Sequence, residues 1–159
     1  MNKWFVLLLV ISCSSCKESK HSLDTNKKPL RAFEIDSIIS KMPNDSVLHD
    51  KTRLGTTMTA SWEFHYDSAN TLYRIVEFQD SSSFKPGMTG NINKYYFNNE
   101  RLMKVTAFKE MEDTLLYLGG YYVDKDSVIY YVKKSPELLP LSLYYKRADS
   151  FFKKAPVKN

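Results

Sequence analysis

A change of hydrophobic period constrains this chain more than any other feature of its sequence. From Met58 to Tyr66 apolar and polar residues alternate one by one, as in a β-strand that buries a single face. A strand-turn-strand unit recurs further along the chain, and the units align at Tyr66-Asp67, Phe97-Asn98 and Val123-Asp124. Asp and Asn tolerate the left-handed backbone that tight hairpins need. The pattern predicts three hairpins in an antiparallel meander of roughly six strands. The expected strands cover residues 57–66, 72–79, 94–97, 102–108, 120–123 and 128–133.

Segments with helical periodicity precede and follow this predicted sheet in the sequence. Ile35, Ile38, Ile39 and Met42 have the spacing of one helix face, and Pro43 ends the pattern. A second apolar face follows Pro140 and consists of Leu141, Tyr144, Tyr145, Ala148, Phe151, Phe152 and Ala155. We expect an α+β fold in which an N-terminal helix and a C-terminal amphipathic helix cover the apolar face of the sheet. A closed barrel or cup is the alternative, and residues 44–55 fit either a short helix or a loop.

The first residues have the pattern of an export signal. Lys3 supplies a positive charge, and residues 4–11 form an apolar run that is shorter than the roughly 20 residues a membrane-spanning helix needs. Val10-Ile11-Ser12-Cys13 resembles the lipobox of bacterial lipoproteins. The resemblance implies that residues 1–12 are a signal peptide and that Cys13 carries acyl chains such as palmitate. Cys16 is the alternative acceptor. Ser14 stands where Asp implies inner-membrane retention, which favours the outer membrane of a Gram-negative bacterium. An ordinary signal peptide with an incidental cysteine is the competing interpretation.

Composition divides the rest of the chain into a tether and one domain. Residues 13–31 are polar and Lys-rich, which predicts a flexible tether, and residues 32–159 suffice for a single domain with a real core. The formal net charge is +5. Basic patches bind nucleic acid or anionic membranes, or simply keep a protein soluble. Export excludes nucleic acid as a physiological partner, so we expect a membrane, through the lipid anchor, and an envelope protein.

The sequence contains no catalytic signature. Cys13 and Cys16 form a C-x-x-C motif outside any βαβ pattern, and the absence of further cysteines excludes a disulfide framework or a zinc-cysteine site. We expect no metal and no cofactor. The histidines, namely His21, His49 and His65, are scattered and are predicted at the surface. The acidic residues Glu110, Glu112, Asp113, Asp124 and Asp126 are interpreted as turn and solubility residues.

Aromatic residues are the remaining candidates for function. Neighbours such as Tyr95 and Tyr96 on one strand point to opposite faces, so one of each pair lies away from the core unless both faces are covered. The predicted partner or ligand surface consists of Trp62, Phe64, Tyr96 and Tyr122. Cross-strand packing within the sheet is the alternative explanation. The predicted loop 80–91 is a second candidate contact surface.

A second resemblance covers about 25 residues. Met42-Pro-Asn-Asp-Ser-Val47, Leu54-Gly55-Thr56 and Trp62-Glu-Phe-His-Tyr66 resemble the small outer-membrane lipoproteins that accompany the barrel-assembly machine. Lys41 stands where that family has Gly, and no Pro follows Thr56. The resemblance implies helix before strands and no particular role.

Three functions therefore compete. The first is a non-enzymatic envelope lipoprotein that binds a protein partner through its sheet. The second is a carrier of small apolar ligands, which needs a cavity of about 300 Å³ or more between sheet and helix, lined by Trp62, Phe64 and tyrosines. The third is an enzyme, which would require His49 or His65 to meet buried carboxylates.

Overall fold

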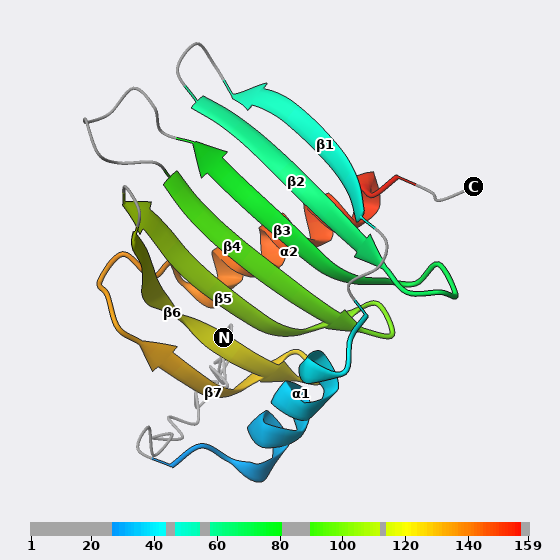
Figure 1. Ribbon diagram of the computed structural model, residues 1–159. Coiled ribbons are helices and arrows are strands. Elements are labelled where there is room, and N and C mark those ends of the chain that lie inside the picture. The colour runs from blue at the N-terminus through cyan, green and yellow to red at the C-terminus, as the bar shows by residue number, and fades with distance from the viewer. Residues whose placement is uncertain (1–26, 44–46, 55–57, 81–89, 112–113, 157–159) are drawn as a thin grey trace, which may run out of the picture.

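The computed structural model describes residues 27–43, 47–54, 58–80, 90–111 and 114–156. Within these ranges the chain forms a seven-stranded antiparallel sheet with a helix at either end of the sequence (Figure 1). In chain order the elements are α1 (Leu30–Ser40), β1 (Val47–Leu54), β2 (Met58–Tyr66), β3 (Leu72–Asp80), β4 (Gly90–Asn98), β5 (Arg101–Met111), β6 (Thr114–Asp124), β7 (Ser127–Lys133) and α2 (Leu141–Lys154). The predicted α+β fold, a meander between two helices, is confirmed.

Each strand pairs with its neighbours in the sequence, in the order β1-β2-β3-β4-β5-β6-β7. The three predicted hairpins are β2–β3, β4–β5 and β6–β7. Both central turn residues have positive φ in the last two hairpins, at Asn99 and Glu100 and again at Lys125 and Asp126. Such a pair is the mark of a type I′ turn, whose twist matches that of the paired strands. These turns therefore help to fix the register of the sheet.

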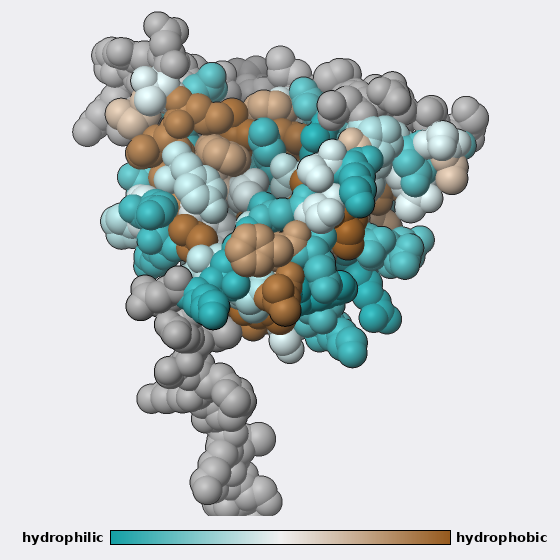
Figure 2. All heavy atoms as spheres, turned by 60° about the horizontal axis from the view of Figure 1, so that its bottom comes forward, coloured by the Kyte–Doolittle hydropathy of each residue, from teal (hydrophilic) through white to brown (hydrophobic). Residues whose placement is uncertain are grey.

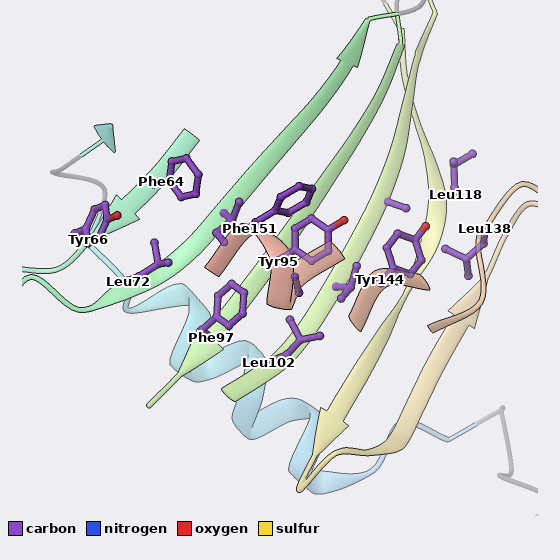
Figure 3. Packing of buried hydrophobic residues seen from close by; sticks show 14 residues of the cluster. Phe64, Tyr66, Leu72, Tyr95, Phe97, Leu102, Leu118, Leu138, Tyr144 and Phe151 are labelled. Atoms are coloured by element: carbon purple, nitrogen blue, oxygen red, sulfur yellow. The ribbon is translucent and has the colours of Figure 1, made fainter. Parts of the chain in front are cut away.

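The larger of two cores lies between one face of the sheet and α2. Tyr144, Ala148 and Phe151 of α2 are buried because they recur at helical spacing on one side of the helix. Figure 3 shows Tyr95 of β4 beside Tyr144 and Phe151, and its ring centroid lies 6.3 Å and 5.8 Å from theirs. Edge-to-face contacts of this kind add to the stabilisation from burial. The other predicted face residues of this helix, Leu141, Tyr145, Phe152 and Ala155, also pack against this core. The packing of the C-terminal helix on the sheet is thus confirmed.

Helix α1 lies on the opposite face of the sheet, which corrects the expectation that both helices share one face. Ala32 and Ile35 of α1 form a smaller core with Met103 of β5 and Tyr122 of β6. Alternation along a strand explains this second core. Tyr121 points toward α2, so its neighbour Tyr122 points the other way and is covered by α1.

Other boundaries also differ from the predicted ones. Residues 47–54 form β1 rather than a helix or loop, so the sheet has seven strands where roughly six were expected. Helix α1 begins at Leu30, inside the predicted tether. Glu110 lies within β5 rather than in a connecting turn. Strands β1 and β7 are the two edges of the sheet, which is open rather than closed (Figure 1).

Candidate functional site

The sheet face that carries α1 is only partly covered by that helix. Met103 and Tyr122, which α1 contacts, lie toward one end of β5 and β6. Figure 1 shows α1 over that end of the sheet, whereas no described helix lies on this face toward the opposite strand ends. An antiparallel sheet commonly packs one face on a core and exposes the other. The uncovered region is therefore the place to look for a contact surface.

A row of apolar side chains crosses this uncovered region. Strand pairing places Phe78 opposite Ile92, Ile92 opposite Phe108, and Phe108 opposite Tyr117. All four side chains are half-buried, and the ring centroids of Phe108 and Tyr117 are 5.4 Å apart. Directly opposed residues on antiparallel strands have Cβ atoms about 4.5–5.5 Å apart. The four side chains thus form one continuous strip from β3 to β6, which we call the apolar row.

A cation borders the apolar row. Nζ of Lys94 lies 5.4 Å from the centroid of the Phe108 ring, within the range of a cation–π interaction. Burial raises the pKa of Tyr117 above its usual value, so this phenol is neutral at physiological pH. The row therefore presents aromatic and aliphatic carbon with one positive charge at its margin.

His65 is buried, which corrects its predicted place at the surface. Only 4% of the residue is exposed, and its ring nitrogens lie 3.0 Å from Nη2 of Arg74 and 3.3 Å from Oε2 of Glu63. Arg74 is the cross-strand partner of His65 in the β2–β3 hairpin, and Tyr73 adds a ring contact. Glu63 remains half-exposed. Glu63, the carboxylate near His65, is therefore not the buried one that the enzyme hypothesis requires.

A polar cluster around Glu77 is enclosed beneath α2. Glu77 is 2% exposed. Its carboxylate accepts hydrogen bonds from the Tyr95 hydroxyl at 2.8 Å, from Asn93 at 3.0 Å and from Gln79 at 2.7 Å. Nη1 of Arg147 on α2 approaches it at 3.4 Å. Burial, followed by the charge of Glu77, raises the pKa of the Tyr95 hydroxyl far above its usual value. The carboxylate is surrounded by donors of the protein itself, which is the arrangement of a structural link between sheet and helix.

A second charged cluster attaches α1 to the sheet. The carboxylate of Asp36 on α1 contacts Lys28 and lies 2.6 Å from Nζ of Lys104 on β5, and the Tyr122 hydroxyl donates to it at 3.1 Å. Burial alone would raise the pKa of Asp36, but hydrogen bonds from Lys104 and Lys28 lower it below its usual value. Nζ of Lys104 also lies 4.6 Å from the centroid of the Tyr122 ring. Charge and cation–π contacts therefore converge on one side of α1.

An open cleft of about 460 Å³ lies beside α1, at the β4–β5 and β6–β7 turns. Its cationic lining residues are Arg31, Arg101 and Lys125. Arg31 is partly neutralised by Asp124 at 3.3 Å. The predicted carrier cavity should be lined by Trp62 and Phe64, which do not line this cleft.

The four aromatic residues predicted to form one surface are divided between two cores. Trp62 and Phe64 belong to the core beneath α2, whereas Tyr96 and Tyr122 belong to the core beneath α1. Phe64 is 1% exposed and Tyr122 is 6% exposed. The predicted set is corrected on this point, because alternation sends its members to opposite faces. Tyr96 and Tyr122 do share a face with the apolar row.

Several predicted residues lie outside the described residues. These are Cys13, Cys16, His21, Glu112, Asp113 and most of the predicted loop 80–91. His49 lies in β1. Asp126 lies in the β6–β7 turn, as predicted, whereas Asp124 is the last residue of β6 and pairs with Arg31.

The clusters around Glu77 and Asp36 and the apolar row were not predicted, and the sequence contains a local signal only for the first of these three. Ile75, Glu77 and Gln79 alternate on β3, so a carboxylate occupies a position of core parity. The apolar row draws one residue from each of four strands, so only the pairing register assembles it.

Three negative findings complete the description. Among the residues that the structure describes, no group of three or more His, Cys, Asp or Glu side chains could hold a metal ion. Neither described helix is long and apolar enough to span a membrane. No protein-family model, no curated protein and no solved structure matches this chain.

Proposed function

We propose that this protein is an exported lipoprotein of the bacterial cell envelope and that its domain is a non-enzymatic module that binds a protein partner through the apolar row. The observation that carries the binding role is the alignment of Phe78, Ile92, Phe108 and Tyr117 across four strands on a face that α1 leaves partly uncovered. Export and anchoring are proposed from the sequence alone, from Lys3, the apolar run 4–11 and Cys13.

The chemistry of the apolar row suits the centre of a protein interface. Aromatic residues are enriched in such centres, and most of the binding energy comes from a few large side chains that lose contact with water. Four side chains cannot supply the roughly 800 Å² that each partner buries in a stable complex. Lys94 and other residues around the row would form the polar rim. We infer a partner with a complementary apolar strip and a carboxylate placed to meet Lys94.

Site-specific cross-linking tests this role. A photoreactive residue replaces Phe108 in one variant and Ser142, an exposed residue of α2, in the matched control. We expect one defined envelope protein to be cross-linked from position 108 and not from position 142. The Ile92→Arg substitution should abolish that product while the circular dichroism spectrum stays native. Equal labelling from both positions, or a product that survives Ile92→Arg, would contradict the role of the row.

Metabolic labelling tests the anchor separately. Radiolabelled palmitate should enter the wild-type protein and the Cys16→Ala variant, but not Cys13→Ala. Equal labelling of the two alanine variants would refute the assignment of Cys13.

The cleft beside α1 supports a second candidate function, that of a carrier of a small apolar ligand. Its volume of about 460 Å³ is in the range of ligand sites. The residues predicted to line a carrier cavity have other contacts, however, since the Trp62 and Phe151 rings pack with centroids 5.5 Å apart. Native mass spectrometry of protein purified from its host should find no bound lipid or small molecule. A stoichiometric ligand would favour the carrier.

A further inference from the structure

The first turn of α1 exposes two large apolar side chains. Leu30 is 82% exposed and Phe33 is 56% exposed, the highest values among the large hydrophobic residues of the described ranges. Residues three apart are neighbours on a helix surface, so Leu30 and Phe33 form a single patch. Ala32 and Ile35 already attach this part of α1 to the sheet. Nζ of Lys28 lies 4.7 Å from the centroid of the Phe33 ring, but neither Leu30 nor Phe33 belongs to a hydrophobic core of the described residues.

Positive charge accompanies this patch. Residues 27–41 contain four cations, Lys27, Lys28, Arg31 and Lys41, against the two carboxylates Glu34 and Asp36. Asp36 is held by Lys28 and Lys104, and the exposed Arg31 pairs with Glu34 and Asp124. Lys27 is exposed beside the patch. Figure 2 brings the α1 end of the molecule forward and shows small hydrophobic groups among hydrophilic residues there, with a broader hydrophobic area toward the upper left. Apolar side chains with neighbouring cations are typical of helices that bind anionic membrane surfaces.

The position of the patch in the chain limits its distance from a lipid anchor. Only residues 14–26 separate Cys13 from the first described residue. A chain of that length reaches at most about 50 Å, whatever its conformation. A tether confines the domain near the surface to which it is attached, so that even a weak affinity leads to contact.

From exposure, charge and position we propose that the first turn of α1 is a membrane-contact site, in which Leu30 and Phe33 enter the boundary between lipid headgroups and acyl chains. Lys27 and Arg31 lie at the level of anionic phosphates. The inference rests on the proposed anchoring at Cys13, and it adds a preferred orientation of the domain on the bilayer.

Vesicle binding by the unacylated protein tests the proposal. The full chain from residue 13 onward is prepared with Cys13→Ser and mixed with vesicles of phosphatidylethanolamine and phosphatidylglycerol, or of phosphatidylcholine alone. We expect the protein to sediment with the anionic vesicles and to bind them less when salt is added. It should bind the vesicles of phosphatidylcholine alone more weakly. The double variant Leu30→Ser/Phe33→Ser should bind the anionic vesicles at least about tenfold more weakly than the wild type does. Lys27→Gln should reduce binding to anionic vesicles by about fivefold.

A matched control distinguishes this site from general stickiness. Leu115 and Leu116 are 50% and 47% exposed on β6, so Leu115→Ser/Leu116→Ser removes comparable apolar surface elsewhere. We expect that variant to bind vesicles as the wild type does. In addition, a tryptophan introduced by Phe33→Trp should be quenched by brominated lipid, whereas Trp62 of the parent protein should not.

Three results would overturn the membrane site. They are no sedimentation with either vesicle type, an equal loss in the Leu115/Leu116 control, and no lipid quenching at position 33. None of these readouts depends on acylation or on the apolar row. Failure here is therefore distinguishable from failure of the palmitate or cross-linking tests.

Discussion

Glu77→Ala is the substitution with the clearest expected cost. The wild-type carboxylate accepts hydrogen bonds from Tyr95, Asn93 and Gln79, and Arg147 approaches it. Alanine leaves the Tyr95 hydroxyl and the Asn93 amide without this acceptor in a buried site. Each orphaned buried group costs about 1–3 kcal/mol. The loss of charge pairing for the half-exposed Arg147 adds less than about 1 kcal/mol because solvent screens it.

The expected total loss is about 3–5 kcal/mol in the free energy of unfolding, close to that for breaking a buried ion pair. A domain of this size is typically stable by about 5–15 kcal/mol, so the variant should fold but be markedly weakened. Urea unfolding of the chain from residue 13 onward measures the change. Trp62 is then the only tryptophan, and as the cross-strand partner of Glu77 it reports on this part of the core.

Glu137→Ala is the control for this measurement. Glu137 is an exposed carboxylate that pairs with Lys109 at 2.8 Å, and its loss should cost less than about 1 kcal/mol. The reasoning is refuted if Glu77→Ala costs no more than this control while unfolding stays cooperative. That outcome would mean that the donors around Glu77 find other partners at no cost.

Two further predictions concern backbone space and alkaline pH. Gly119 has φ of +144°, and a Cβ atom there would overlap the Val132 carbonyl oxygen, so Gly119→Ala should destabilise the protein by at least about 2 kcal/mol in urea; a neutral effect would contradict the tight β6–β7 approach. Burial raises the pKa of both Tyr95 and Tyr144. Their contribution to stability is therefore complete below the usual tyrosine pKa of 10.0 and is lost as pH rises above it. Absorbance titration should show their ionisation only together with unfolding, whereas ionisation in the folded state would argue against their burial.

Local periodicity was sufficient to predict most elements of the fold. Period-two alternation placed β2, and the recurrence of a strand-turn-strand unit with Asn and Asp at its turns placed the strands of the three hairpins. Strand β1 escaped because Val47–Leu54 contains Asp50, Lys51 and Arg53 in its centre and lacks apolar alternation. Charges of this kind are common on edge strands, where they discourage pairing with other molecules. Strand β1 forms because its backbone pairs with the edge of β2. The sequence of residues 47–54 gives no local sign of this pairing.

The assignment of helices to faces needed more than periodicity. An apolar stripe indicates that one face of a helix is buried, but it does not identify the surface against which that face packs. The doublets Tyr95-Tyr96 and Tyr121-Tyr122 were the informative signal, because the two members of each point to opposite faces of the sheet and one of them is left exposed unless both faces are covered. The apolar row could not be predicted from the sequence, because only the pairing register of four strands brings its members together.

The two cores differ in size, and this difference predicts that α1 opens before the rest of the domain. Among the described residues, fourteen buried residues make up the α2 core, whereas four make up the α1 core. Small units with few buried contacts open at a lower free energy than the whole protein. Asp36, Lys28 and Lys104 offset part of this weakness. The pKa of Asp36 is lowered in the folded state, so its contribution is present above the usual value of 3.8 and is lost as pH falls below it.

Asp36→Asn should therefore mimic acid at neutral pH. Because the Asp36 side chain is 35% exposed, we discount its contribution for solvent screening to about 1 kcal/mol, or roughly fivefold in an opening equilibrium. Native-state hydrogen exchange should become about fivefold faster in residues 30–40 and remain unchanged in residues 144–151. Equal acceleration in both helices would instead mean that α1 opens only when the whole domain unfolds. A selective change would show that the proposed membrane-contact turn lies on an element that opens independently of the rest of the domain.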